Sequence, residues 1–169
     1  MYKLLLSTLE RMKHNKEMEV DFERFIKGGM KNQFVLYQYI PSVLLNEKKY
    51  ILDAFITTVS IIALHIPNNE NKINFQNGNK SFMASYAIYK GFSDEHKQKI
   101  VINLLKNEND KQKFIKLLVN QILQYCSNVN YMWLFHDLIT LYQYNDISNL
   151  LDKWGKEFFQ KSNEEKNNE

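Results

Sequence analysis

Residues 48–64 have the sequence KKYILDAFITTVSIIAL, the longest apolar helical segment of the chain. Its apolar side chains occur on every side of a helix and not in a single stripe, which predicts a central helix covered by other helices on nearly every side. The apolar run from Ile51 to Ile66 contains Asp53 and His65 and is too short to span a bilayer. The proline at position 67 ends the segment. We therefore expect a helical protein built around this segment.

Helical spacing of apolar residues also occurs on both sides of the central segment. Before it, helices are predicted over residues 2–13, 20–27 and 33–45, the last with a break near Tyr39 because Pro41 cannot continue a helix. After an asparagine-rich loop over residues 68–79, helices are predicted over 81–90 and 93–107 and then from Asp110, Asn130 and Asp146 onward. Only 5 glycines and 2 prolines are present, too few for sandwiches, barrels or nucleotide-binding α/β folds. The prediction is an all-α fold, a compact bundle of roughly eight helices.

The length of 169 residues fits one domain, or two small lobes that share a core. We expect a single helical domain over residues 1–161 and a polar, flexible tail over residues 162–169. The single cysteine, Cys126, excludes a disulfide framework and a zinc site built from cysteines. Together with the lack of a secretory leader pattern, it predicts a cytoplasmic location.

The sequence offers little catalytic chemistry. Its four histidines, at positions 14, 65, 96 and 136, include no pair at helical metal-binding spacing. His136 and Asp137 are neighbours, and neighbouring side chains on a helix point about 100° apart, so they cannot form a catalytic pair. No glycine-rich phosphate loop is present. We therefore expect no enzyme, no catalytic residue, no cofactor and no metal.

The charge is mildly basic, with a formal net charge of +3 that comes from 20 lysines and only 2 arginines. Lysine makes point contacts with phosphates, whereas reading a base favours arginine. An AT-rich coding sequence would also favour lysine, together with the abundant Asn, Ile, Tyr and Phe, and this compositional explanation stays open.

Two sets of lysines and amides recur at helical spacing without acidic residues between them. The 113–124 row consists of Lys113, Lys116, Asn120 and Gln124, and the 99–106 row consists of Lys99, Asn103 and Lys106. Such rows suit contact with a phosphate backbone, although an ordinary solvated helix face stays an equal alternative. Most aromatic residues lie at core positions, and Tyr37, Tyr39 and Tyr86 are the ones left open for base stacking.

Several short motifs resemble, in order and spacing, the CasB family, the small subunit of the type I-E CRISPR surveillance complex called Cascade. In the first half these are the basic element at 22–28 (FERFIKG), with one arginine where the family has a pair, and the helix end at 63–67 (ALHIP). The Asn-Phe entry at 74–75 follows, with Gln76 in place of the family's glycine and Gly78 two residues later.

The second half continues the resemblance. Residues 95–99 (EHKQK) correspond to an arginine-rich helix of the family with lysines in place of arginines, and residues 113–118 (KFIKLL) correspond to its second basic helix. The closing segments 131–138 (YMWLFHDL) and 154–159 (WGKEFF) are similar to the family's Leu-x-x-Asp-Leu and terminal Trp-x-x-x-Phe/Tyr-Trp patterns.

The resemblance implies a non-catalytic subunit that binds the target and displaced strands of DNA without regard to sequence and stabilises the R-loop. Its implied partners are the backbone and large Cascade subunits, a second copy of itself and the crRNA-guided target DNA, with no membrane. The expected nucleic-acid-binding residues are Arg24, Lys27, Lys48, Lys49, Lys97, Lys99, Lys113 and Lys116. Two alternatives stay open: a small helical subunit of a type III CRISPR effector complex, and a helical protein-interaction adaptor that binds no nucleic acid.

Overall fold

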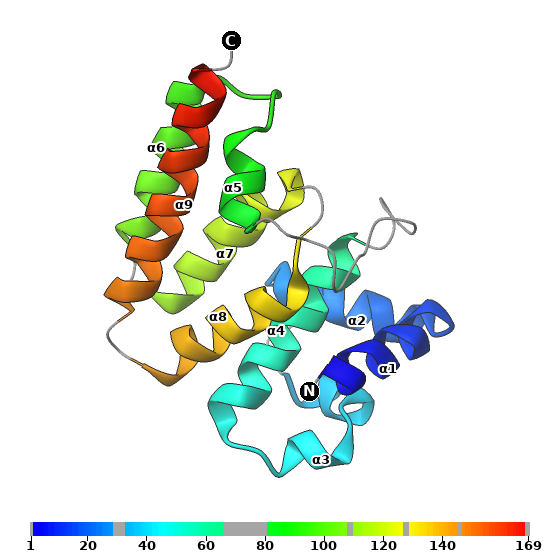
Figure 1. Ribbon diagram of the computed structural model, residues 1–169. Coiled ribbons are helices and arrows are strands. Elements are labelled where there is room, and N and C mark those ends of the chain that lie inside the picture. The colour runs from blue at the N-terminus through cyan, green and yellow to red at the C-terminus, as the bar shows by residue number, and fades with distance from the viewer. Residues whose placement is uncertain are drawn as a thin grey trace. The chain divides into compact units, whose positions relative to one another are not determined.

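The computed structural model describes residues 2–28, 33–65, 81–107, 110–126, 129–144 and 147–167 (Figure 1). Within these ranges every regular element is a helix, and eight of the helices have seven residues or more. This confirms the predicted all-α fold of about eight helices. The loop expected over residues 68–79 and the N-cap expected at Asp146 lie outside the described residues. None of the described helices is both long enough and apolar enough to cross a membrane.

The chain divides into two compact units, residues 1–73 and 74–169, where the sequence led us to expect a single domain over residues 1–161. The first unit contains α1 (Tyr2–Lys13), α2 (Lys16–Ile26), the 3-10 helix η1 (Gln33–Tyr39), α3 (Ser42–Leu45) and α4 (Lys49–His65). The second contains α5 (Phe82–Ala87), α6 (Asp94–Leu105), α7 (Lys111–Gln121), the 3-10 helix η3 (Leu123–Tyr125), α8 (Tyr131–Gln143) and α9 (Ser148–Lys166).

Helix α4 is the central helix of the first unit, as its apolar sequence predicts. Every residue from Ala54 to Ala63 is buried, and α1, α2 and α3 pack against the helix. The buried hydroxyls bond within the helix itself: Thr58 donates to the Ala54 carbonyl at 2.8 Å and Ser60 donates to the Ile56 carbonyl at 2.7 Å. Internal bonding of this kind lets polar residues sit in an apolar environment at little cost.

Two helix boundaries in the first unit differ in detail from the sequence prediction. Helix α2 begins at Lys16 and not at Val20, because the Asn15 side chain accepts a hydrogen bond from the Met18 N–H at 3.0 Å and so caps the helix. The segment 33–45 breaks before Pro41, as expected, but its first half is a 3-10 helix.

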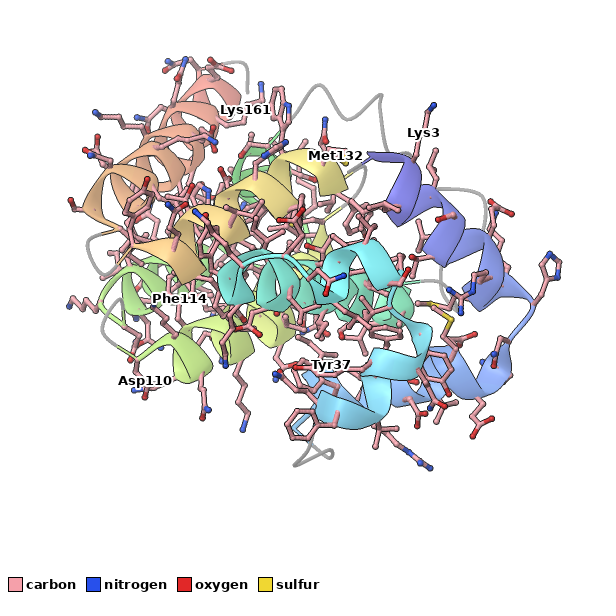
Figure 2. The ribbon with its side chains drawn as sticks, turned by 90° about the horizontal axis from the view of Figure 1, so that it is seen from below. Lys3, Tyr37, Asp110, Phe114, Met132 and Lys161 are labelled. Carbon is pink, nitrogen blue, oxygen red and sulfur yellow. The ribbon has the colours of Figure 1, made fainter. Side chains whose placement is uncertain are left out.

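The second unit is organised around Trp154 of α9, whose side chain is fully buried. The Phe82 ring of α5 meets the Trp154 ring edge-on at 4.8 Å between centroids, and the Phe114 ring of α7 stacks on it at 5.8 Å. Figure 2 labels Phe114 on α7, together with Asp110 at the exposed start of that helix. Helix α9 packs against α5, α6 and α8, and α6 packs against α7.

Local capping fixes where the helices of the second unit begin. The Ser93 hydroxyl accepts from the His96 N–H at 3.3 Å, and the Asp110 carboxylate accepts from the Lys113 N–H at 3.0 Å. These are caps that the sequence predicts. At the other end, α9 continues to Lys166, and the Ser162 side chain is buried, where the sequence led us to expect a polar tail from residue 162.

Candidate nucleic-acid interface

Two of the expected binding residues lie on or just after α2. The Arg24 side chain is exposed, and no carboxylate pairs with it within the described ranges. Lys27 is also exposed, but its ammonium forms an ion pair with Glu23 one turn earlier on the same helix. An ion pair at this spacing is weak and exchanges readily with solvent, so Lys27 is less available to a phosphate than Arg24.

Two further residues lie at the start of α4. The Lys48 ammonium lies 5.9 Å from the centroid of the Tyr50 ring, a cation–π distance. The Lys49 ammonium lies 4.0 Å from a carboxylate oxygen of Asp53. Burial raises the pKa of Asp53, while the ammonium of Lys49 acts in the opposite direction. Both lysines are exposed, so they remain accessible from solvent.

Lys97 is placed differently from every other expected residue, because only 4% of its surface is exposed. Its ammonium donates to the carbonyl of Ala87, the last residue of α5, at 2.5 Å and pairs with Asp94 at 3.0 Å. This buried ammonium links α6 to the end of α5 and is not accessible to a phosphate. The prediction that Lys97 binds nucleic acid is therefore wrong.

The 99–106 row lies along the exposed face of α6 and its C-cap, since Lys99, Asn103 and Lys106 are all exposed. Lys99 pairs with Glu95 at 2.8 Å, so this row is not free of acids. Both partners of the pair are largely exposed, and such pairs contribute little and are screened by salt.

The 113–124 row is the clearest cationic feature of the second unit. Lys113, Lys116, Asn120 and Gln124 are all exposed, three on α7 and the last on η3. Neither lysine pairs with a carboxylate in the part of the chain that the structure describes. The apolar residues of α7 point the other way, toward the core around Trp154. A phosphate can therefore reach both ammonium groups without displacing an acidic side chain.

The expected residues thus fall into two sets. Arg24, Lys27, Lys48 and Lys49 belong to the first unit, whereas Lys97, Lys99, Lys113 and Lys116 belong to the second. Within the second unit, α6 and α7 pack against each other, so the 99–106 and 113–124 rows lie on neighbouring helices. This pair of rows is the strongest candidate interface.

The tyrosines left open for base stacking do not form exposed platforms. Tyr39 is 6% exposed, and its hydroxyl donates to Asp21 at 3.0 Å; burial and this bond raise the pKa of Tyr39 to about 12. Tyr86 is fully buried, and burial raises its pKa. Tyr37 is partly exposed and packs edge-on against Phe34. The hypothesis that bases stack on Tyr39 or Tyr86 is therefore wrong, because both rings belong to the core.

Trp133 is an exception to the expectation that most aromatic residues lie at core positions, because its side chain is 52% exposed. Position 133 lies between the buried positions 131 and 134, and a helix turns each successive side chain by about 100°. Trp133 lines a small cleft with residues of α5, α8 and α9, including Asp137 and Lys153. The cleft holds only about 10 Å³, about one water-sized sphere, so it is not a ligand pocket.

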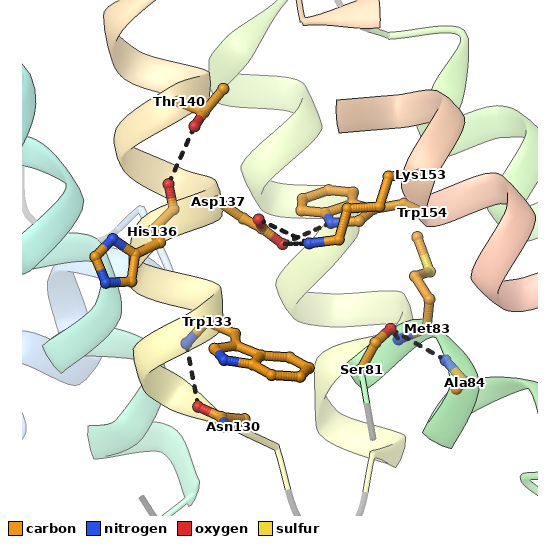
Figure 3. Close-up of polar contacts among 10 residues, drawn as sticks. All are labelled: Ser81, Met83, Ala84, Asn130, Trp133, His136, Asp137, Thr140, Lys153 and Trp154. Carbon is orange, nitrogen blue, oxygen red and sulfur yellow. Dashed lines mark hydrogen bonds and ion pairs between the residues drawn. The ribbon is translucent and has the colours of Figure 1, made fainter. Parts of the chain in front are cut away.

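Asp137 joins α8 to α9 and does not serve His136 (Figure 3). Its carboxylate accepts from the Trp154 indole N–H at 2.8 Å and pairs with Lys153 at 3.1 Å. The His136 side chain points away from Asp137, as adjacent positions on a helix require.

The lone thiol, Cys126, also lacks the setting of a nucleophile. Burial raises its pKa, and its sulfur lies 3.1 Å from the Phe82 carbonyl oxygen. Among the described residues no group of three metal-ligating side chains comes together.

Comparison of the chain with protein-family models, with curated proteins and with solved structures finds no match.

Proposed function

We propose that this chain is a non-catalytic, all-helical subunit that binds the sugar–phosphate backbone of nucleic acid, as the small subunit of a type I-E Cascade complex does. The observation that carries the proposal is the 113–124 row, in which two exposed ammonium groups have no acidic partner within the described ranges. Amides continue the row along the same face, and amides donate to phosphate oxygens without adding base specificity.

The proposed role needs charge without sequence readout. In an R-loop, base pairing with the guide RNA selects the target, and a few backbone contacts are enough to shift a nearly balanced exchange of strands. Lysine ammonium groups supply such contacts as point charges. The proposed partners are the backbone and large subunits of the complex, a second copy of this chain and the target DNA.

The test is the salt dependence of binding to single-stranded DNA. Lys113→Glu combined with Lys116→Glu should weaken binding and lower the slope of log affinity against log salt by about 0.7 for each phosphate that is no longer bound, so by about 1.4 in total. The control variant, Lys13→Glu with Lys156→Glu, makes the same change in net charge at two lysines that are ion-paired with Glu10 and Asp152.

The control variant should keep its slope within about 0.3, because its lysines contact no phosphate. Equal loss of affinity in both variants would mean that net charge alone drives binding and would remove the 113–124 row from the proposal. A type III subunit would instead bind a guide–target RNA duplex more tightly than single-stranded DNA. The same titration with such a duplex distinguishes the two functions.

One observation favours the adaptor as a second candidate. Four apolar side chains of η1 and α3 in the first unit are exposed: Phe34, Val35, Val43 and Leu45. Exposed apolar residues in neighbouring elements are typical of protein contacts. An adaptor of this kind would bind no nucleic acid in a salt-dependent manner, so the titration above also decides between the two functions.

A further inference from the structure

Four aromatic rings gather at the end of the second unit where α6 begins and η3 lies. Tyr89 and Phe92 precede α6, His96 is in its first turn, and Tyr125 ends η3. We call these four residues the ring cluster. The Phe92 ring is its centre, with centroid distances of 4.8 Å to His96, 4.8 Å to Tyr125 and 5.4 Å to Tyr89, and the Tyr89 and Tyr125 rings lie 5.0 Å apart.

The ring cluster is accessible from solvent, unlike the core rings around Trp154. His96 is exposed, and Tyr89, Phe92 and Tyr125 are each partly exposed. The rings meet at tilted or edge-on angles between 36° and 76° and do not stack face to face.

One end of each lysine row is close in sequence to a member of the ring cluster. On α6, His96 precedes Lys99 by three positions, so the ring and the ammonium share one face of the helix. On α7 and η3, the 113–124 row ends at Gln124, the residue before Tyr125. Lys116 lies in the middle of α7, and Tyr125 follows the end of that helix on η3.

The acidic residues beside the ring cluster are already neutralised. Asp94 pairs with the buried ammonium of Lys97 at 3.0 Å, and Glu95 pairs with Lys99 at 2.8 Å. The carboxylates at positions 94 and 95 are therefore both paired, and the unpaired ammonium groups of Lys113 and Lys116 lie on α7, the helix that precedes η3.

We propose that unpaired bases of a single-stranded nucleic acid stack on the ring cluster while the lysine rows hold the strand's phosphates. Exposed rings next to a cationic track are the combination that binds single strands without sequence preference, because every base has a face that can stack. This inference rests on the proposed function, since the same rows supply the phosphate contacts. It adds that the bound strand is single and that its bases, not only its phosphates, are held.

A glycine supports the geometry of the ring cluster. The Tyr89 ring lies over Gly91, and a β-carbon at position 91 would overlap ring atoms of Tyr89. Those atoms are the far end of a side chain, so Gly91→Ala would displace the ring without breaking the backbone. Gly91→Ala therefore perturbs the cluster without removing any aromatic residue.

The experiment compares oligo(dT) with an abasic oligodeoxyribose-phosphate of the same length by fluorescence anisotropy, using the full chain. Oligo(dT) should bind at least about fivefold more tightly, and up to about 150-fold for each base that stacks well. Oligo(rU) serves as the RNA arm and should show the same preference over its abasic form, because stacking does not depend on the sugar.

The variants His96→Ala, Tyr125→Ala and Gly91→Ala should each reduce the preference for oligo(dT) over the abasic strand by at least about threefold. The control is Tyr144→Ala, which removes an exposed ring of the same unit outside the cluster and should leave the preference unchanged. Circular dichroism confirms folding of each variant, and His96, being exposed, is the substitution least coupled to the fold.

The outcomes separate the two proposals. Equal affinity for oligo(dT) and the abasic strand, with binding still weakened in the Lys113→Glu and Lys116→Glu double variant, would overturn base stacking and leave the proposed function in place. Loss of preference in the Tyr144→Ala control would place the stacking site elsewhere and would also overturn the inference. Absence of salt-dependent binding to both strands would overturn the proposed function and, with it, the stacking site.

Discussion

The bond between the Asp137 carboxylate and the Trp154 indole gives the sharpest test of how the second unit holds together. Trp154 is fully buried, so its N–H has no access to water, and Asp137 accepts from it at 2.8 Å. The perturbation is Asp137→Ala, which removes the acceptor and leaves the indole N–H unpaired in the core (Figure 3).

The magnitude follows from the two interactions that Asp137 makes. An unpaired buried donor costs about 1–3 kcal/mol, and a hydrogen bond to a charged acceptor is at the upper end of the usual range. The ion pair with Lys153 adds less than about 1 kcal/mol, because the Lys153 side chain is 47% exposed. We expect Asp137→Ala to lower the free energy of unfolding by about 2–3 kcal/mol, Asp137→Asn by about 1 kcal/mol and Lys153→Ala by less than about 1 kcal/mol.

The assay is urea unfolding followed by tryptophan fluorescence. Both tryptophans, Trp133 and Trp154, belong to the second unit, so the signal reports on that unit alone. A double-mutant cycle with Trp154→Phe isolates the bond, because phenylalanine has no donor and Trp133 still provides a signal. In the Trp154→Phe background, Asp137→Ala should cost at least about 1 kcal/mol less than in the native chain.

An equal cost of Asp137→Ala in both backgrounds would refute the bond as the source of stability. Should Trp154→Phe fail to fold, the comparison of Asp137→Ala with Lys153→Ala still decides the matter. If the two lower the free energy of unfolding equally, the indole bond contributes nothing measurable.

Two further predictions concern charged groups that are wholly or partly buried. Lys97→Met keeps the apolar stem but leaves the Ala87 carbonyl without its ammonium donor, so the free energy of unfolding should fall by about 1–3 kcal/mol. The control, Lys99→Met, changes an exposed site and should alter the free energy of unfolding by less than about 1 kcal/mol. Equal effects of the two substitutions in urea unfolding would contradict the role assigned to Lys97. Burial raises the pKa of Asp53 above 3.8, so the folded state binds the carboxyl proton more tightly than the unfolded state does. This tighter binding stabilises the folded state at low pH, and the stabilisation is lost as the pH rises through the folded-state pKa. Asp53→Asn does not titrate, so its stability relative to the native chain should increase from about pH 3 to about pH 7, and a pH-independent difference in thermal unfolding would show that Asp53 has an ordinary pKa.

The sequence predicted the helices of the second unit well because their start signals are local. Ser93, Asp110 and Asn130 each bond an N–H three residues ahead, an interaction that needs no tertiary contact. Asn15 makes the same bond, but it stands in a run of polar residues that looked like a break, so the start of α2 was misplaced by four residues.

The candidate interface was predicted less well, because side-chain environments depend on tertiary packing. Nothing in the sequence marks Lys97 as buried, since its partner is the carbonyl that ends another helix, α5. The i, i+4 spacing of Glu95 and Lys99 does predict their ion pair, but the row of lysines was defined without Glu95. The sequence did not predict the ring cluster, because only the fold brings Tyr125 of η3 to Tyr89 and Phe92, which precede α6.

The division of the chain at residue 73 has a consequence for biosynthesis. Each unit consists of one uninterrupted stretch of sequence, and every helix of the first unit precedes every helix of the second. Chains emerge from the ribosome from the N-terminus, and compact units generally fold one after another. The N-terminal half can therefore gather α1 to α4 around their shared apolar residues while translation of the remainder is still under way.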